Sequence, residues 1–269
     1  MTIRSVFFFS ACAMCATAAH AGSVEFIDPK GDDNGPGTYT YPTDPAYKKG
    51  SFDVVGVKVR DKGANVEITI QLAAAVEDPW DSKKWPDPGW GFSLQQFQIY
   101  VDTDGKAGSG EADGLPGTNV TFADDSRYEH VLIVGPHSPK TFQGEIDRKA
   151  AKFKQRVILP KTVEVRGKEV TAIFPKANIP FDPAKVGWQV LVASEEGYPK
   201  DNDILMRRVN EFEGPHRFGG GDDGMTDPHV IDILAGKAKG DASEVAAQHA
   251  QLKYDAKANK KAVLTMVRP

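Results

Sequence analysis

Two neighbouring runs of alternating apolar and polar residues constrain the fold of this 269-residue chain more than any other feature. In residues 65–72, every second side chain is valine, isoleucine or leucine, which is the period of a strand buried on one face. Residues 52–60 place valines at 55, 57 and 59, and the turn signal Asp-Lys-Gly-Ala separates the two runs. The sequence therefore predicts an antiparallel hairpin over residues 52–72.

Further short strands are predicted along the chain, in residues 92–102, 129–134, 163–166, 169–174, 186–193 and 261–267. Residues 186–193 are apolar on both faces, which is typical of a central strand. A helix is predicted only in residues 241–252, with Ser243 as its N-cap. We therefore expect an all-β fold, an antiparallel β-sandwich of jelly-roll type with long decorating loops and one short C-terminal helix. No linker divides residues 22–269, so we expect a single domain there.

The first 21 residues have the pattern of a secretory signal peptide. Arg4 precedes an apolar stretch, and residues 19–21, Ala-His-Ala, supply a small-x-small cleavage site. Both cysteines, Cys12 and Cys15, lie in this segment, so the processed chain would contain no thiol and no disulfide. That excludes thiol catalysis, zinc–thiolate sites and iron–sulfur clusters. We expect an exported protein, periplasmic or secreted to the cell surface, whose stability depends on its core or on bound ions. Lipid modification of Cys12 is the alternative.

Charge and motif content argue against several function classes. The formal net charge is −4, which is unfavourable for a nucleic-acid partner. After residue 21 we expect no transmembrane segment, because no stretch is long and apolar enough. The chain has neither the Gly-x-Ser-x-Gly nor the His-Glu-x-x-His motif. We therefore expect a protein that is not an enzyme, although 37 acidic residues leave an unrecognised glycoside hydrolase open.

The first long loop has the composition of a cation site. Asp28, Asp32, Asp33 and Asn34 fall within seven residues, separated by glycine and proline. Close anionic oxygens repel one another unless a cation lies between them, and calcium prefers such hard oxygen ligands. Asp53 follows the loop and is placed to reach the same ion. We expect Ca²⁺ here; the alternative is a set of Asx turns with solvated charges.

A second acidic loop begins at Asp102, where a strong predicted strand ends. Residues 102–114 start like a calcium loop but lack the later spacing of an EF-hand. Asp102 is the best-placed metal ligand in this loop, and the alternative is a polar turn.

Three of the four tryptophans lie in one loop, residues 78–90. Flat aromatic faces in a polar loop are suited to stacking against sugar rings, whose C–H bonds meet the negative face of the ring. For Trp85 and Trp90, flanked by proline and charges, sugar stacking and core cover are both open. For Trp80 we expect core cover.

At this point several motifs resemble a known family, the C-terminal binding module of glucodextranase. The N-terminal motif is Asp-Pro-Lys-Gly-Asp-Asp-Asn-Gly-Pro-Gly-Thr-Tyr-Thr-Tyr-Pro at residues 28–42. The others follow in order across nearly the whole chain, at residues 50–53, 78–80, 91–95, 98–100, 218–224, 227–232 and 262–267. The resemblance implies a β-sandwich related to family-nine carbohydrate-binding modules and to DOMON domains.

The resemblance implies binding of carbohydrate, as a glucan-type polymer or oligosaccharide, and association with the cell surface. We expect Trp85, Trp90, Tyr39 and Tyr41 to contact that ligand. Two alternatives stay open. A DOMON-like protein would hold haem b for electron transfer between axial ligands drawn from Met206, Met225, His216 and His229. An envelope interaction module would bind no small molecule.

Overall fold

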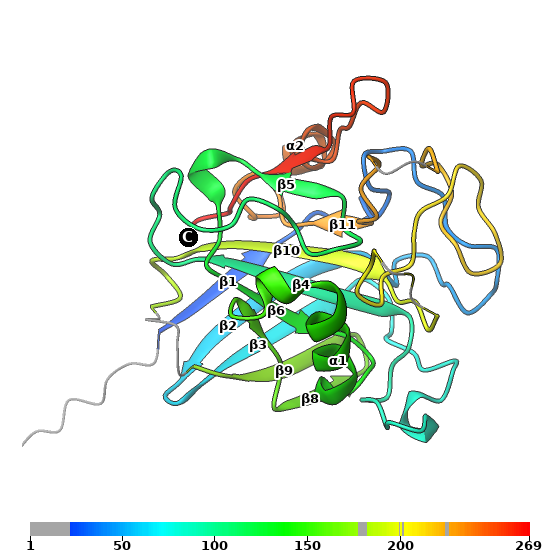
Figure 1. The fold of residues 1–269 in the computed structure, drawn as a ribbon, viewed down its shortest axis with the longest axis horizontal. Coiled ribbons are helices and arrows are strands. Elements are labelled where there is room, and N and C mark those ends of the chain that lie inside the picture. Colours follow the sequence, from blue (N-terminus) through cyan, green and yellow to red (C-terminus); the bar gives the residue numbers. More distant parts are fainter. Residues whose placement is uncertain (1–21, 177–181, 199, 201, 224–225) are drawn as a thin grey trace, which may run out of the picture.

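The computed structural model describes residues 22–176, 182–198, 200, 202–223 and 226–269. The expected signal peptide, residues 1–21, and Met225 lie outside the described residues. The fold is all-β, as expected, with strands in two main sheets (Figure 1). None of the helices in the described part of the chain is long and apolar enough to cross a membrane.

The first sheet has five antiparallel strands in the order β1-β2-β3-β9-β8. They are β1 (Ser23–Ile27), β2 (Val54–Lys62), β3 (Asn65–Leu72), β8 (Thr162–Arg166) and β9 (Glu169–Pro175). The hairpin predicted over residues 52–72 is confirmed. A bulge between Val54 and Gly56 shifts the register, so that Val54 rather than Val55 points into the core.

The second sheet has the order β11-β10-β4-β6-β7. Its strands are β4 (Gln95–Asp102), β6 (His130–Val134), β7 (Val157–Ile158), β10 (Gly187–Ser194) and β11 (Asp232–Ile233). The prediction that residues 186–193 form a central strand is confirmed, because β10 lies between β4 and β11 and is buried throughout. Beside this sheet, β5 (Val120–Phe122) pairs in parallel with β12 (Ala262–Leu264).

One hydrophobic core joins the two sheets. Ile68 and Ile70 of β3 are fully buried in the same cluster as Ile99 of β4 and Val190 of β10. Burial of each such side chain contributes about 1.5–3 kcal/mol, and the shared core makes the two sheets a sandwich.

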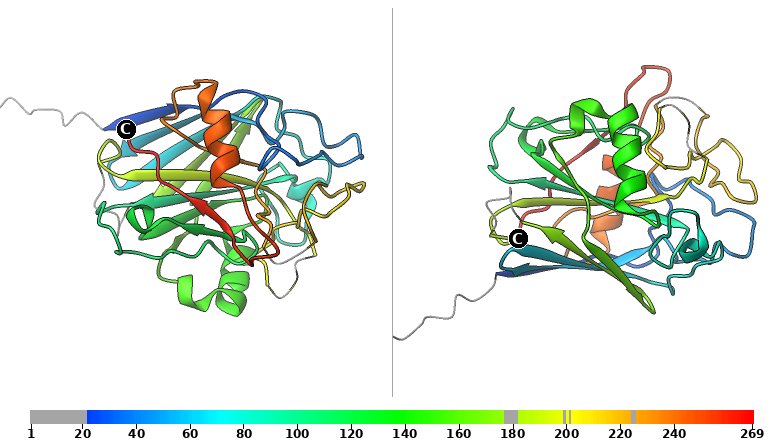
Figure 2. Two further views of the ribbon diagram at one scale, coloured as in Figure 1. Left: turned by 90° about the horizontal axis from the view of Figure 1, so that it is seen from above. Right: turned by 60° about the horizontal axis from the view of Figure 1, so that its bottom comes forward.

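A second core lies on the outer face of the second sheet. There Tyr100 of β4 and Leu191 of β10 pack in one cluster with Phe142 and Ile146 of helix α1 (Pro139–Lys149) and with Leu264 of β12. Figure 2 shows α1 on the side of the second sheet away from β1 and β2. The second sheet is therefore covered on both faces, which explains why β4 and β10 are buried on both sides.

The two helices show where sequence patterns fail. Helix α1 is not predicted from the sequence, although Ser138 caps it by accepting from the Thr141 amide and Pro139 occupies its first turn. Helix α2 (Ser243–Gln251) lies where a helix is predicted, but Ser243 is not its N-cap. Instead Glu244 accepts hydrogen bonds from the amides of residues 237 and 239–241. Three short 3-10 helices complete the described structure, η1 (Ser82–Lys84), η2 (Asp124–Ser126) and η3 (Ala151–Phe153).

Candidate functional site

Three long loops meet at the end of the sandwich opposite the β2–β3 turn (Figures 1 and 2). They are residues 28–53, 73–94 and 195–231, which connect strands of both sheets. The loops of residues 73–94 and 195–231, together with helix α1 and the segment before it, line a pocket of about 640 Å³. Its lining is Trp80, Trp85, Pro86, Asp87, Ser93, His137, Thr141, Glu195, Gly197, Tyr198, Arg207 and His216.

The aromatic wall of this pocket is built by the loop that the sequence analysis singled out. Trp85 stacks at a tilt on His137, with ring centroids 4.5 Å apart, and its indole Nε1 donates to the carbonyl oxygen of Trp80 at 2.9 Å. Trp80 meets His216 edge-to-face at 5.3 Å and remains 38% exposed. These contacts fix both indole rings before any ligand arrives, so little side-chain entropy is lost when a ligand binds.

The floor of the pocket is polar and deeply buried. Glu195 is only 4% exposed, and its Oε1 lies 3.1 Å from His137 Nε2. Burial raises the pKa of Glu195 to about 7, although the neighbouring His137 opposes the rise. Arg207 beside it donates to the hydroxyl of Tyr47 at 3.0 Å and to the carbonyl of His216 at 2.7 Å. The floor therefore offers donors and acceptors held in fixed positions.

A chain of hydrogen bonds between buried side chains of β4 ends at Glu195. Tyr100 donates to Gln98, Gln98 donates to Gln96, and Gln96 Nε2 lies 3.4 Å from Glu195 Oε2. These side chains alternate with the core-facing residues of β4, so the strand itself sets their spacing. The regular strand thus positions a carboxyl group that stands at the start of an irregular loop.

The structure separates the two tryptophans that are expected to act together. Trp85 lines the pocket, whereas Trp90 packs against the main core and is not among the lining residues. Trp80, which is expected to cover the core, lines the pocket instead. Between Trp80 and Trp85 the chain forms the 3-10 turn η1, which is preceded by Asp81 in the left-handed conformation (φ 49°). Local composition does not reveal that turn.

Tyr39 and Tyr41 lie away from this pocket, along a smaller hollow lined also by Asp33 and Tyr47. Tyr39 is buried, and its hydroxyl donates to the carbonyl of Pro228. The Tyr41 hydroxyl donates to Asp33 and accepts from the Phe52 amide at 3.2 Å. The structure therefore does not bring the two tyrosines together with Trp85.

Two acids of the first loop, Asp28 and Asp32, converge on Asp232, which is not among the expected ligands. Carboxylate oxygens of Asp28, Asp32 and Asp232 lie within 4.8 Å of one another, and all three side chains are buried. Asp53 lies beside them and accepts from the Gly31 amide at 2.8 Å. Burial, with repulsion from neighbouring carboxylates, raises the pKa of Asp28 to about 9 and that of Asp53 to about 7. The available signal for Asp232 is its place at the end of the motif at residues 227–232.

Asp33 and Asn34, the other expected ligands in this loop, face different partners. Asp33 accepts from the Tyr41 hydroxyl, and Asn34 Oδ1 lies 3.2 Å from His249 Nε2. Asp102 belongs to a separate cluster with Asp104 and Glu129.

Asp102 already has donors at both carboxylate oxygens. Arg268 donates to Oδ2, and the Gly105 amide donates to Oδ1 at 2.8 Å. The Arg268 guanidinium thus stands where a cation would be needed.

The side chains that are considered as haem ligands lie in different surroundings. Met206 is buried, and its sulfur accepts from Gln98 at 3.1 Å. His229 is also buried and accepts from the Val209 amide at 3.3 Å. His216, in contrast, lines the pocket of Trp80 and Trp85.

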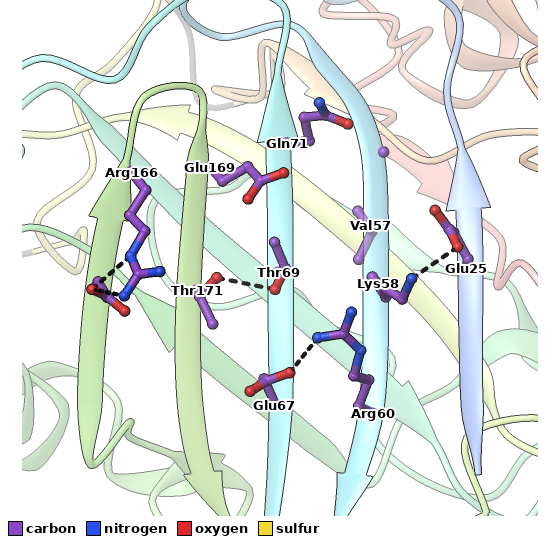
Figure 3. Close-up of a pocket in the computed structure, with 12 residues that line it drawn as sticks. Glu25, Val57, Lys58, Arg60, Glu67, Thr69, Gln71, Arg166, Glu169 and Thr171 are labelled. Atoms are coloured by element: carbon purple, nitrogen blue, oxygen red, sulfur yellow. Dashed lines mark hydrogen bonds and ion pairs between the residues drawn. The ribbon is translucent and has the colours of Figure 1, made fainter. Parts of the chain in front are cut away.

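A further hollow, of about 390 Å³, lies on the outer face of the first sheet (Figure 3). Two ion pairs in this hollow cross between strands, Lys58 with Glu25 at 3.3 Å and Arg60 with Glu67 at 2.7 Å. No aromatic ring is among its lining residues in the described part of the chain. It lacks the stacking surface of the tryptophan pocket.

Comparison with known families gives one finding. A family model described as the C-terminal binding module, SLH-like, of glucodextranase matches residues 24–267. No curated protein matches the chain. The match spans both sheets, all three long loops and helix α2.

Proposed function

The chain belongs to the family of SLH-like C-terminal binding modules of glucodextranase, and on that premise we propose that it is an exported, non-catalytic protein that binds a glucan-type carbohydrate in the pocket of Trp80 and Trp85. The family is described as a binding module rather than a catalytic domain. The signal-peptide pattern of residues 1–21 supports export to the periplasm or the cell surface.

The observation that carries this proposal is that two indole rings and a group of buried polar side chains line the same pocket. A sugar ring presents C–H groups on its faces and hydroxyls around its rim. The indoles of Trp80 and Trp85 suit the faces. Glu195, His137 and Arg207 suit the hydroxyls, because their side chains offer hydrogen-bond donors and acceptors in a buried site.

Binding should be tested first with the full processed chain, on an array of α- and β-glucan oligosaccharides and by pull-down on insoluble glucans. The Trp80→Ala, Trp85→Ala double variant should weaken binding about 30-fold, since each stacked ring contributes about 1 kcal/mol. Arg166→Ala is the matched control, because Arg166 lines the hollow on the outer sheet face. Its affinity should equal that of the wild type.

The opposite pattern would contradict the proposal. If Arg166→Ala weakened binding and the tryptophan variant did not, the ligand would bind on the sheet face. If no glucan were retained by the wild-type chain, glucan binding would be refuted.

A further inference from the structure

A second site is indicated by four buried aspartates that meet between the sheets. Asp28 directly follows β1, and Asp53 directly precedes β2, so both stand at the end of the first sheet. Asp232 opens β11 in the second sheet, and Asp32 lies in the loop between β1 and β2. The fold thus brings Asp232 next to Asp28 and Asp32, which are far from it in sequence.

Several oxygens of this cluster lack a hydrogen-bond donor. Among the residues that the structure describes, none donates with good geometry to either carboxylate oxygen of Asp28, to Asp32 Oδ1 or to Asp53 Oδ1. Asp28 is 4% exposed and Asp32 1% exposed. Buried polar atoms in proteins are almost always paired, so orphaned oxygens on three neighbouring carboxylates require an explanation.

Other groups fix the cluster without supplying a counter-charge. Asp232 accepts from the amides of Val54 at 2.7 Å and Ile233 at 2.9 Å. Gln248 of α2 donates to the backbone carbonyl of Asp32. The carboxylates are therefore held in place by backbone and helix contacts, while their remaining oxygens lie close to one another.

Protons alone do not satisfy this arrangement. A proton on Asp28 would supply a single O–H donor, whereas four carboxylate oxygens of the cluster, on Asp28, Asp32 and Asp53, lack one. A cation at the centre would satisfy the orphaned oxygens together and reverse the repulsion between the carboxylates.

The donor set selects the kind of cation. All four side chains offer hard carboxylate oxygens, without the nitrogen or sulfur that zinc and copper sites use. Magnesium requires a small octahedral shell and retains waters, whereas calcium accepts six to eight oxygens in irregular geometry. The loop that carries Asp28 and Asp32 is irregular, with Gly31 at φ 93°, which suits the calcium geometry better.

We propose that Asp28, Asp32 and Asp232, with Asp53 as the fourth carboxylate, bind one calcium ion that ties the loop of residues 28–53 to the second sheet. This inference is independent of carbohydrate binding, because none of the four residues lines the tryptophan pocket. The ion would take the structural place that disulfides hold in many exported proteins.

The test is calcium content and calcium-dependent melting of the full processed chain. After treatment with EGTA, the melting temperature should fall by about 5–10 °C relative to protein with calcium at a hundredfold excess over its dissociation constant. Calcium should restore it and magnesium should not. Elemental analysis should find one calcium per chain before chelation.

Two isosteric variants complete the design. Asp28→Asn should lose the response to calcium, and Asp104→Asn, in the separate cluster with Asp102, should keep it. If Asp28→Asn fails to fold, the melting of the wild type with EGTA and with calcium still tests the proposal. The proposal is overturned if the wild type contains no calcium and melts identically with EGTA and with calcium. It is also overturned if Asp28→Asn keeps the full calcium response.

Discussion

Replacing Glu195 with glutamine should remove a loss of stability that the wild-type chain suffers as the pH rises. Burial raises the pKa of Glu195 from 4.5 to about 7 in the folded state. At pH values between 4.5 and about 7, Glu195 keeps its proton in the folded state but has released it in the unfolded state. Stability of the wild type therefore falls through this window as the pH rises, and the loss is complete above about pH 7.

The size of the effect follows from the shift. A rise from 4.5 to about 7 corresponds to about 3 kcal/mol of unfolding free energy, because each pKa unit is worth about 1.4 kcal/mol. A glutamine side chain cannot ionise, so the variant escapes this loss. The stability of Glu195→Gln relative to the wild type should therefore rise by about 3 kcal/mol between about pH 4 and pH 8.

Urea unfolding of both proteins at several pH values across this range measures the difference. Buried carboxyls that do not contact Glu195, such as Asp53, affect both curves alike, so subtraction leaves the effect of Glu195 together with its interactions with His137 and Arg207. Parallel stability curves would refute the reasoning, because Glu195 would then have the same pKa in the folded and unfolded states.

Three further substitutions test the packing that supports the pocket, each by urea unfolding. Ile68→Ala, in the core between the sheets, should cost about 2–5 kcal/mol, and a cost below about 1 kcal/mol would contradict a tight sandwich core. Ser138→Ala should cost about 1 kcal/mol through the lost cap of α1, and no change would show that the cap is dispensable. Gln248→Ala should cost about 1–3 kcal/mol through the loss of two buried hydrogen bonds, to the Asp32 carbonyl and from the Ile233 amide, and an unchanged stability would contradict this role.

The sandwich is predictable because its strands carry their own signal. Residues 65–72 alternate with period two, and the buried face found in β3 is the one that the alternation indicates. Helix α1 escapes prediction because its apolar pattern is sparse, with only Phe142 and Ile146 buried along its length. Its cap, Ser138 followed by Pro139, is the available signal.

The residues of the candidate sites can be predicted only where they lie close together in the sequence. Asp28 and Asp32 are close in sequence, and their crowding indicates a cation site. Asp232 joins them through the pairing of strands, which spacing alone does not reveal. The same limit explains Trp80 and Trp90, since only tertiary packing decides which ring faces the pocket and which covers the core.

The most direct test of carbohydrate binding in the tryptophan pocket is to follow the indole N–H signals in nitrogen-15 NMR spectra during titration with a glucan oligosaccharide. The chain has four tryptophans, so each signal can be assigned by single substitution. The signals of Trp80 and Trp85 should shift with increasing ligand, while those of Trp90 and the fully buried Trp188 should stay within experimental error. Saturable binding with Trp80 and Trp85 unshifted would contradict the account.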